Sequence, residues 1–451
     1  MARSPKIPES IFRSYDIRGT TDQLSPELAR RVGAATVKFT GAKRVVVGRD
    51  MRETSPAFAR AVIAGITSQG AEAVDIGKCT TPMFNFAVFA YEAHEAGVMV
   101  TASHNPAEYN GFKMSRGDGF PISGEEIKPL VLANSFQHAT RAGKRKTLNV
   151  MPEYLERVFA LANMPSLKGM RVVVDAGNGM GGIILPKLFK RLDCEMTPLY
   201  FEPDGTFPHH EANPIKPETL EDLQGEVAHQ RADIGIALDG DADRIGFVDE
   251  KGQFVNGDHM LALLAGDRLR AHKGGAVVWS PNASWAVRDA IVRGGGRSVF
   301  EKVGRIHIAR RVQKEKAAIG GEVSAHYFYP EFGGMESTEF TLLLVLKLLA
   351  ESGKSFSELL KSVRTYATLG EVNFEVKEKD AVLAALEKHY ASKAVAGDKL
   401  DGLRLEFKDW WFNVRKSNTE PLIRLNLEAK TSARMKEKHA ELAKFIESHA
   451  G

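Results

Sequence analysis

The stretch VMVTASHNP (residues 98–106) joins an apolar run to a polar segment that contains Thr101, Ser103, His104 and Asn105. The apolar run is typical of a buried strand, which would deliver the Ser103 hydroxyl to the loop that follows. Open α/β sheets place ligands at the carboxyl ends of their strands, and His104 and Asn105 are hydrogen-bond partners beside the serine. Ser103 is therefore a nucleophile candidate. The alternative is a strand-to-turn junction in which these residues serve turn chemistry alone.

The order strand, polar loop, helix recurs along the chain. It is found in residues 43–70, in RVVVDAGNGMGG with the helical IILPKLFKRL (residues 171–192), and more loosely in GAVVWSPNASWAVRDAIV (residues 275–292). Three copies of this order indicate a triplicated α/β design.

Two helix starts are predicted from capping residues. Ser25 is expected to be the N-cap of an amphipathic helix, with Pro26 in its first turn. Ser55 and Pro56 are expected to have the same roles at the start of the next helix.

Length and composition limit the number of domains and the classes of function that the chain can have. The chain of 451 residues exceeds what one core usually organises, which suggests three or four domains. Its 61 Lys and Arg residues and 57 Asp and Glu residues give a net charge of only +4, so composition makes no case for nucleic-acid or membrane-surface binding. Two cysteines, Cys79 and Cys194, argue against a disulfide framework and favour a cytoplasmic location.

No signal peptide or membrane span is expected. The amino-terminal MARSPKIPES lacks an apolar core. The most apolar segment, residues 340–350, is too short to cross a bilayer and contains Lys347, so we predict a buried helix there.

Polar segments mark the expected domain boundaries. RAGKRKTLN (residues 141–149) and EKGQFVNGD (residues 250–258) are predicted connections, and a third boundary falls near Tyr366. After Tyr366, alternating apolar and polar residues predict strands with helices between and after them. The expected fold is α/β, with three related α/β domains on mixed sheets and a smaller α+β domain. The expected domains are residues 1–150, 151–252, 253–366 and 367–451.

A carboxylate cluster follows the apolar strand predicted at residues 234–238. Asp239, Asp241 and Asp243 alternate along the loop, and carboxylates this close repel one another unless a hard divalent cation lies between them. These residues and Glu250 fit positions 1, 3, 5 and 12 of a calcium EF-hand. However, position 6 is an arginine instead of the required glycine, and strand-like segments flank the loop, so the EF-hand is rejected. Solvated surface carboxylates are the other alternative.

The glycines Gly177, Gly179 and Gly182 form a G-x-G-x-x-G pattern between a strand and a helix. This is the context of a dinucleotide-binding fingerprint. The next acidic residues, Asp193 and Glu195, do not clearly end a second strand, so a tight strand-to-helix turn is the preferred interpretation and nicotinamide binding the alternative.

In GGEVSAHYFYP (residues 320–330), Glu322, Ser324 and His326 alternate, so in an extended segment they point to one side. A carboxylate, a hydroxyl and an imidazole suit the vicinal hydroxyls of a sugar. The alternative is the polar face of a half-buried strand.

The loop RKSNTEPLIR (residues 415–424) combines guanidinium groups, hydroxyls and loop amides, which suit a phosphate without any Walker glycines. Taken alone, such a loop is also typical of a simple turn. The residues proposed for this phosphate cradle are Arg415, Ser417, Asn418, Thr419 and Arg424.

Together the four motifs resemble one family, the α-D-phosphohexomutases, which include phosphomannomutases and phosphoglucomutases. TASHNP resembles the family's phosphoserine loop, DGDADR its magnesium loop, GEVSAH its sugar-recognition loop and RKSNTEP its phosphate-binding loop. They occur in the family's order, and the resemblance runs from YDIRG (residues 15–19) to RLNLEA (residues 424–429). It implies four domains around a central cleft and a phosphotransferase activity.

The resemblance also implies residue roles. Ser103 would carry a phosphoryl group, and phosphorylated Ser103 would bind Mg²⁺ together with Asp239, Asp241 and Asp243, which would hold the ion against that phosphate. Arg18 and Arg244 would offset charge on the moving phosphoryl group, while His104 or Lys113 would assist proton transfer. The residues expected to bind substrate are Tyr15, Lys302, Gly304, Arg305, Glu322, Ser324, His326, Arg415, Ser417, Asn418, Thr419 and Arg424.

The implied reaction exchanges a hexose 1-phosphate and its 6-phosphate through a hexose 1,6-bisphosphate, which also serves as activator. GEVSAHYF and RKSNTEP resemble the phosphomannomutase branch more than the phosphoglucosamine branch, which typically shows GEQSGH and RPSGTEP. We therefore expect a phosphomannomutase that also acts on glucose phosphates. The alternatives are a phosphoglucomutase, a phosphoglucosamine mutase, a non-catalytic sugar-phosphate sensor and, more distantly, a nicotinamide dehydrogenase. Hexose phosphates are the expected partners, with no nucleic acid or membrane, and the expected assembly is a monomer or homodimer.

Overall fold

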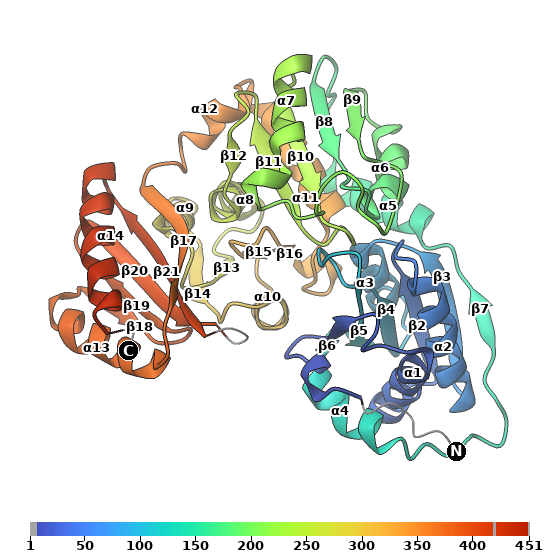
Figure 1. Ribbon diagram of the computed structural model, residues 1–451. Coiled ribbons are helices and arrows are strands. Elements are labelled where there is room, and N and C mark those ends of the chain that lie inside the picture. Colours follow the sequence, from blue (N-terminus) through green and yellow to red (C-terminus); the bar gives the residue numbers. More distant parts are fainter. Residues whose placement is uncertain (1–6, 418–420, 450–451) are drawn as a thin grey trace. The chain divides into compact units, whose positions relative to one another are not determined.

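The computed structural model describes residues 7–417 and 421–449 (Figure 1). These residues belong to two compact units. The first unit comprises the residues up to Asn256 together with Ser324–Ser357. The second comprises Gly257–Val323 and the residues from Glu358 onward. Both units combine helices with sheets, so the predicted α/β class is confirmed.

The first part of the first unit is built on a seven-stranded mixed sheet. Its elements are η1 (Glu9–Ile11), β1 (Ile17–Thr20), α1 (Pro26–Thr40), β2 (Arg44–Arg49), α2 (Ser55–Ser68), β3 (Glu72–Lys78), α3 (Thr81–Phe89), β4 (Ala96–Val100), β5 (Tyr109–Arg116), β6 (Pro121–Ile122), α4 (Gly124–Ala133) and β7 (Arg145–Thr147). The strand order is β1-β5-β4-β2-β3-β7, with β6 paired to β5. The neighbouring strands β4, β2, β3 and β7 are parallel, whereas β5 is antiparallel to both β4 and β1.

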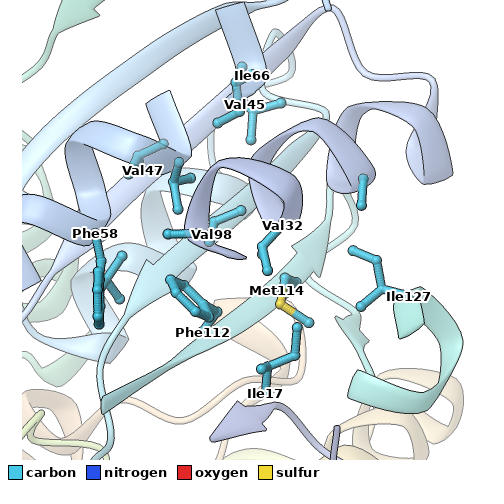
Figure 2. Packing of buried hydrophobic residues seen from close by; sticks show 14 of the residues in the cluster. Ile17, Val32, Val45, Val47, Phe58, Ile66, Val98, Phe112, Met114 and Ile127 are labelled. Atoms are coloured by element: carbon cyan, nitrogen blue, oxygen red, sulfur yellow. The ribbon is translucent and has the colours of Figure 1, made fainter. Parts of the chain in front are cut away.

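Helices cover both faces of this sheet. Val98 of β4 belongs to the core beneath α1 and α2, where Figure 2 shows it beside Val47, Phe58 and Phe112. The preceding residue, Gly97, faces α3 on the opposite side, since a Cβ there would lie 2.5 Å from Val88 Cγ2. The central strands are therefore buried on both faces, which explains their nearly continuous apolar sequences.

The two predicted helix starts have different outcomes. Ser25 caps α1 as predicted, because its Oγ accepts the Leu28 N–H at 3.1 Å and Pro26 is the first helical residue. The prediction that Ser55 caps α2 is wrong. Ser55 is already the first residue of the helix, so Thr54 occupies the N-cap position, and the Ser55 hydroxyl donates to Asp50 Oδ1 at 2.5 Å.

The rest of the first unit contains a five-stranded sheet of order β12-β11-β10-β8-β9. The helices and strands of this part of the first unit are α5 (Met151–Ala162), β8 (Arg171–Asp175), α6 (Gly181–Phe189), β9 (Glu195–Leu199), η2 (Pro217–Thr219), α7 (Glu221–Gln230), β10 (Ile234–Leu238), β11 (Ile245–Asp249), β12 (Phe254–Val255), β16 (Tyr327–Phe328), η3 (Pro330–Phe332) and α11 (Thr338–Ser352), of which β16 is not a strand of the five-stranded sheet. The strands β10, β8 and β9 are parallel, and β10 and β11 form an antiparallel pair.

Two other predictions concern this part of the chain. The G-x-G-x-x-G segment forms a tight strand-to-helix turn, in which Gly177 has a φ of +52° and a Cβ on Gly182 would lie only 1.9 Å from Phe201 O. The segment 340–350 lies in the buried helix α11, as predicted. Among residues 7–417 and 421–449, no helix has the length and apolar character needed to cross a membrane.

The second unit contains two further sheets. The third sheet has β14-β13-β15 in parallel order and comes from α8 (Gly257–Ala271), β13 (Ala276–Trp279), α9 (Trp285–Arg293), β14 (Arg297–Phe300), α10 (Arg305–Glu315) and β15 (Ile319–Gly321). The fourth is antiparallel, with order β17-β21-β20-β19-β18. It comes from β17 (Ala367–Glu375), α13 (Lys379–Tyr390), η4 (Ala391–Lys393), β18 (Ala396–Asp398), β19 (Leu403–Glu406), β20 (Trp410–Lys416), β21 (Leu422–Ala429) and α14 (Ser432–Glu447), after the short α12 (Phe356–Leu360). This carboxyl-terminal part is α+β, as predicted.

Candidate active site

Ser103 lies in the loop that connects β4 to β5. Its Oγ donates to Asp239 Oδ2 at 2.8 Å and lies 3.2 Å from His104 Nδ1. The backbone φ of Ser103 is +54°, a left-handed conformation that is unfavourable for a non-glycine residue. Its N–H donates to Thr101 Oγ1 at 3.0 Å, which helps to hold this conformation. The strand therefore ends by presenting a hydroxyl to the loop, and that hydroxyl is directed at the carboxylate cluster.

Asp239, Asp241 and Asp243 lie in the loop between β10 and β11, and all three are buried. Each offers a carboxylate oxygen, and these atoms lie within 4.8 Å of one another. Such a set of oxygen atoms suits a hard divalent cation. Strands flank the loop on both sides, in agreement with the rejection of an EF-hand.

Two observations test whether this cluster fits a cation. Burial, together with the neighbouring Asp243 and Asp241 carboxylates, raises the pKa of Asp239 to about 8. Asp241 Oδ1 is buried and has no hydrogen-bond partner among the described residues. Because an ionised carboxylate oxygen is costly to bury without a partner, both observations fit a site that holds a metal ion.

Lys113 of β5 supplies a positive charge to the cluster. Its Nζ lies 2.6 Å from Asp241 Oδ2 and 2.6 Å from Asp243 Oδ2. The same Asp241 oxygen accepts hydrogen bonds from Thr81 Oγ1 at 2.6 Å and Thr101 Oγ1 at 3.2 Å. Three donors on one oxygen fix the orientation of the Asp241 carboxylate and leave its Oδ1 available for a cation.

His104 is a neutral imidazole near neutral pH. Burial lowers its pKa well below the usual value, and the nearby guanidinium groups of Arg244 and Arg18 lower it further. A neutral imidazole can accept a proton, and its Nδ1 already faces the Ser103 hydroxyl.

Arg18 and Arg244 are far apart in sequence, but both lie near the Ser103 loop. Arg18 of β1 donates from Nη1 to Asn105 Oδ1 at 2.7 Å, and it is anchored by Asp16. Arg244 Nε donates to His326 Nε2 at 3.4 Å. Tyr15, on the segment before β1, is exposed. The structure thus brings both arginines close to the Ser103 loop.

The segment that contains Glu322, Ser324 and His326 is not extended, so that part of the prediction is wrong. The residues after β15 form a turn in which Ala325 has a φ of +65°. As a result, Ser324 and His326 face each other, with Ser324 Oγ 2.9 Å from His326 Nδ1. His326 Nε2 also lies 3.3 Å from Asp243 Oδ1, which joins this turn to the carboxylate cluster within the first unit.

In the second unit, Glu322 lies beside the loop that precedes α10. Its Oε1 accepts the Gly304 N–H at 2.7 Å, and Gly304 has a φ of +131°, which favours glycine. Lys302 is exposed, and Arg305 is the first residue of α10. Asp401 Oδ2 accepts the Val303 N–H at 2.8 Å. Carboxylates therefore hold this loop from two sides.

Arg415 and Arg424 are cross-strand partners on β20 and β21. Both bind the same carboxylate, because Arg415 Nη2 donates to Glu371 Oε2 at 2.8 Å and Arg424 Nη1 donates to Glu371 Oε1 at 3.1 Å. Ser417 is buried at the end of β20, and its N–H donates to Leu422 O at 3.0 Å. The predicted Asn418 and Thr419 lie outside the described residues.

Several site residues escaped the sequence analysis. Thr81 and Asp401 lie far in sequence from the groups they contact, and no local pattern indicates them. Thr101 belongs to the polar segment that follows the apolar run, but the sequence predicts no role for it. Glu371 lies on a strand whose alternation was recognised, but only the pairing of β17 with β21 shows which cations it meets.

Four family models match the chain in order. They are described as phosphoglucomutase/phosphomannomutase alpha/beta/alpha domains I (residues 9–138), II (152–252) and III (256–366) and the phosphoglucomutase/phosphomannomutase C-terminal domain (371–445).

Full-length relatives and solved structures are also similar. A phosphomannomutase of Vibrio cholerae serotype O1 is 37% identical, with 97% of this chain and 98% of that protein aligned. A Methanopyrus kandleri protein named "Probable phosphoglucosamine mutase" is 36% identical, with 96% and 97% aligned. The crystal structure of a phosphoglucomutase/phosphomannomutase family protein from Burkholderia thailandensis has a TM-score of 0.90 at 31% identity and covers 98% of each chain.

Proposed function

Because the chain belongs to the phosphoglucomutase/phosphomannomutase family and is thus an intramolecular phosphotransferase, we propose that it interconverts mannose 1-phosphate and mannose 6-phosphate. We propose glucose phosphates as further substrates. The observation that carries the proposal is the 2.8 Å hydrogen bond from Ser103 Oγ to Asp239 within a buried carboxylate cluster. A binding protein would need neither a phosphorylatable serine nor three aspartates facing it.

The proposed reaction proceeds in two balanced transfers. Phosphorylated Ser103 gives its phosphoryl group to a hexose monophosphate: the bond from Ser103 Oγ to phosphorus breaks, the bond from a sugar hydroxyl oxygen to phosphorus forms, and the hydroxyl proton passes by way of a base to the departing Ser103 Oγ. The resulting hexose 1,6-bisphosphate reorients and returns its other phosphoryl group to Ser103, which leaves the isomeric monophosphate. Added bisphosphate would also phosphorylate a dephosphorylated enzyme and so act as activator.

In this proposal Asp239, Asp241 and Asp243 would hold Mg²⁺, which would supply Lewis-acid stabilisation of the phosphoryl oxygens. Lys113 offsets part of the cluster's negative charge from 2.6 Å. Arg18 and Arg244 offset negative charge on the phosphoryl group during transfer.

His104 is the proposed proton acceptor. It is neutral because burial and two guanidinium groups lower its pKa, and its Nδ1 is 3.2 Å from Ser103 Oγ. Lys113 is the alternative, but its ammonium group would first have to lose a proton, which the two carboxylates that it binds disfavour.

The remaining residues are proposed to bind the sugar phosphate. Glu322, Ser324 and His326 would bind sugar hydroxyls, while Tyr15, Lys302, Gly304 and Arg305 would help to enclose the ligand. The phosphate that is not being transferred would occupy the cradle of Arg415, Ser417, Asn418, Thr419 and Arg424.

A phosphoglucosamine mutase is the second candidate, because the 36% identical Methanopyrus kandleri relative carries that name. The valine in GEVSAH and the lysine and asparagine in RKSNTEP favour mannose over glucosamine, since the other branch typically has GEQSGH and RPSGTEP.

A direct assay tests the proposal. Purified protein is incubated with Mg²⁺, a trace of hexose 1,6-bisphosphate and, in parallel, mannose, glucose or glucosamine 1-phosphate. Formation of mannose 6-phosphate with the highest kcat/KM is expected, and phosphopeptide mapping should find phosphate on Ser103. Ser103→Ala is the matched control and should form no phosphoprotein. Failure to convert any of the three hexose phosphates would overturn the proposal.

Three further features belong to this proposal. The functional domains are residues 1–150, 151–252, 253–366 and 367–451. The assembly is a monomer or homodimer. The cytoplasm is the proposed location, in line with two cysteines that are both free.

A further inference from the structure

Arg52 is buried and binds four backbone carbonyl groups of the Ser103 loop. Its Nη2 donates to Ser103 O at 3.0 Å and to Asn105 O at 2.5 Å. Its Nη1 donates to Pro106 O at 2.6 Å and to Tyr109 O at 2.9 Å. The side chain is 1% exposed, so water does not compete for these carbonyl groups. One planar group thus fixes the path of the loop from Ser103 to Tyr109.

The Arg52 guanidinium group also contacts a carboxylate and an aromatic ring. Its Nε lies 3.3 Å from Asp50 Oδ2, and the Phe207 ring centroid lies 5.1 Å from its Cζ. A Cβ on Gly205 would lie 2.6 Å from Arg52 Cα, so the segment that carries Phe207 packs directly on the arginine. These contacts restrict Arg52 to one orientation.

The Ser103 carbonyl group is also confined by the aspartate loop. A Cβ on Gly240 would lie 2.5 Å from Ser103 O, so this oxygen lies between the Gly240 backbone and the Arg52 guanidinium group. With the carbonyl group fixed, the left-handed φ of Ser103 directs Oγ toward Asp239. The contact between the two loops therefore depends on the position of this peptide group.

From these contacts we propose that Arg52 is a positioning residue for phosphoryl transfer, which holds Ser103 in its strained conformation by binding the carbonyl groups of its loop. Arg52 contacts only the backbone of the loop and does not touch the reacting hydroxyl. A lysine cannot replace it, because a single ammonium group lacks the planar fork that reaches four acceptors. The link to phosphoryl transfer rests on the proposed function, whereas the effect on the loop does not.

Hydrogen exchange tests the effect on the loop without any assay of activity. In Arg52→Lys, the amides of residues 101–109 should exchange at least about tenfold faster than in the wild type, since local opening becomes easier. Ile66→Ala is the control, because Ile66 is buried in the α1 and α2 core shown in Figure 2 and the cavity destabilises the same sheet layer. Its 101–109 amides should keep wild-type protection. If Arg52→Lys does not fold, Phe207→Leu carries the test, because it removes only the ring that packs on the guanidinium group.

Kinetics test the link to transfer. With hexose 1-phosphate as substrate, Arg52→Lys should lower kcat about a hundredfold while KM changes less than about threefold, because a small misplacement of the nucleophile affects the transfer step more than substrate binding. The rate of Ser103 phosphorylation by hexose 1,6-bisphosphate should fall by a similar factor. Ile66→Ala, assayed well below its Tm, should retain kcat within about threefold.

The outcomes separate the two claims. Wild-type kcat and wild-type exchange in Arg52→Lys would overturn the positioning role, as would an equal loss of kcat in Ile66→Ala. If the wild-type protein converts no hexose phosphate, the proposed function fails, and the exchange comparison still decides whether Arg52 holds the loop.

Discussion

Ser103 Oγ and Asp239 Oδ2 form a 2.8 Å hydrogen bond although 136 residues separate them in sequence. The contact joins two loops that each follow a buried strand, β4 in one sheet and β10 in another. It brings a nucleophile candidate to a group whose pKa is raised to about 8 by burial and by Asp243 and Asp241. The cluster therefore destabilises the folded chain when ionised without a cation.

Mg²⁺ should consequently raise the Tm of the wild-type protein, and EDTA should reverse the effect. A ligand at a hundred times its Kd stabilises the folded state by about 2.7 kcal/mol. Asp239→Asn removes the carboxyl group whose raised pKa makes folding costly at neutral pH, so its Tm without cation should exceed that of the wild type, and its response to Mg²⁺ should be much smaller. Differential scanning fluorimetry with and without 5 mM EDTA measures both effects. An equal Mg²⁺ response in the variant would refute the assignment of Asp239 as a ligand.

Gly240→Ala should lower mutase activity by about a hundredfold, because the new Cβ would lie 2.5 Å from Ser103 O and must push the two loops apart. Gly225→Ala is the matched control. Gly225 lies in the exposed part of α7, where a Cβ meets no atom within 4 Å, so this variant should keep full activity and gain roughly 0.5–1 kcal/mol in stability. Steady-state kinetics and urea unfolding of both variants provide the comparison. Wild-type kcat in Gly240→Ala would show that the close approach is not needed.

The sequence was informative where a feature is local. Strand ends, the capping of α1 by Ser25 and the carboxylate loop could all be predicted, because hydrophobic periodicity and turn chemistry act over a few residues. The turn at Ala325 was missed because alternation of polar residues occurs in turns as well as in strands.

Contacts between distant segments could not be predicted from periodicity. Arg52 lies just beyond β2 in a run of charged residues, and nothing local shows that its partners are the carbonyl groups of Ser103, Asn105, Pro106 and Tyr109. Such partners depend on which strands become neighbours. Here the parallel pairing of β2 with β4 brings the two strand ends together.

Glu371→Gln should lower KM for hexose phosphates. In the folded chain Glu371 binds both Arg415 and Arg424, so its negative charge lies where a phosphate is proposed to bind. Removal of one negative charge close to a bound phosphate at a partly exposed site should strengthen binding by about 1 kcal/mol, or roughly fivefold in affinity. Steady-state kinetics should show this fall in KM with little change in kcat. Arg415→Ala should act in the opposite direction, and a raised KM in Glu371→Gln would indicate that the carboxylate is needed to orient the arginines.

Glu428→Gln should stabilise the protein at pH 8 but not at pH 5. Burial raises the pKa of Glu428 to about 7 from an ordinary value of 4.5, with Asp258 adding to the effect, although Ser284, Trp411 and the Trp285 N–H donate hydrogen bonds that oppose it. Because the folded chain binds this proton more tightly than the unfolded chain, the stability it contributes is fully present below pH 4.5 and is lost as the pH rises through about 7.

The raised pKa of Glu428 also sets how much stability is lost as the pH rises. The loss amounts to about 3 kcal/mol at most, and it is absent in the glutamine variant, whose amide oxygen can still accept from Trp411 Nε1 and Trp285 N. Urea unfolding followed by tryptophan fluorescence at pH 5 and pH 8 measures the difference between the two proteins. A difference of the same size at both pH values would show that Glu428 does not titrate in this range, and the stabilising effect would then have to come from packing alone.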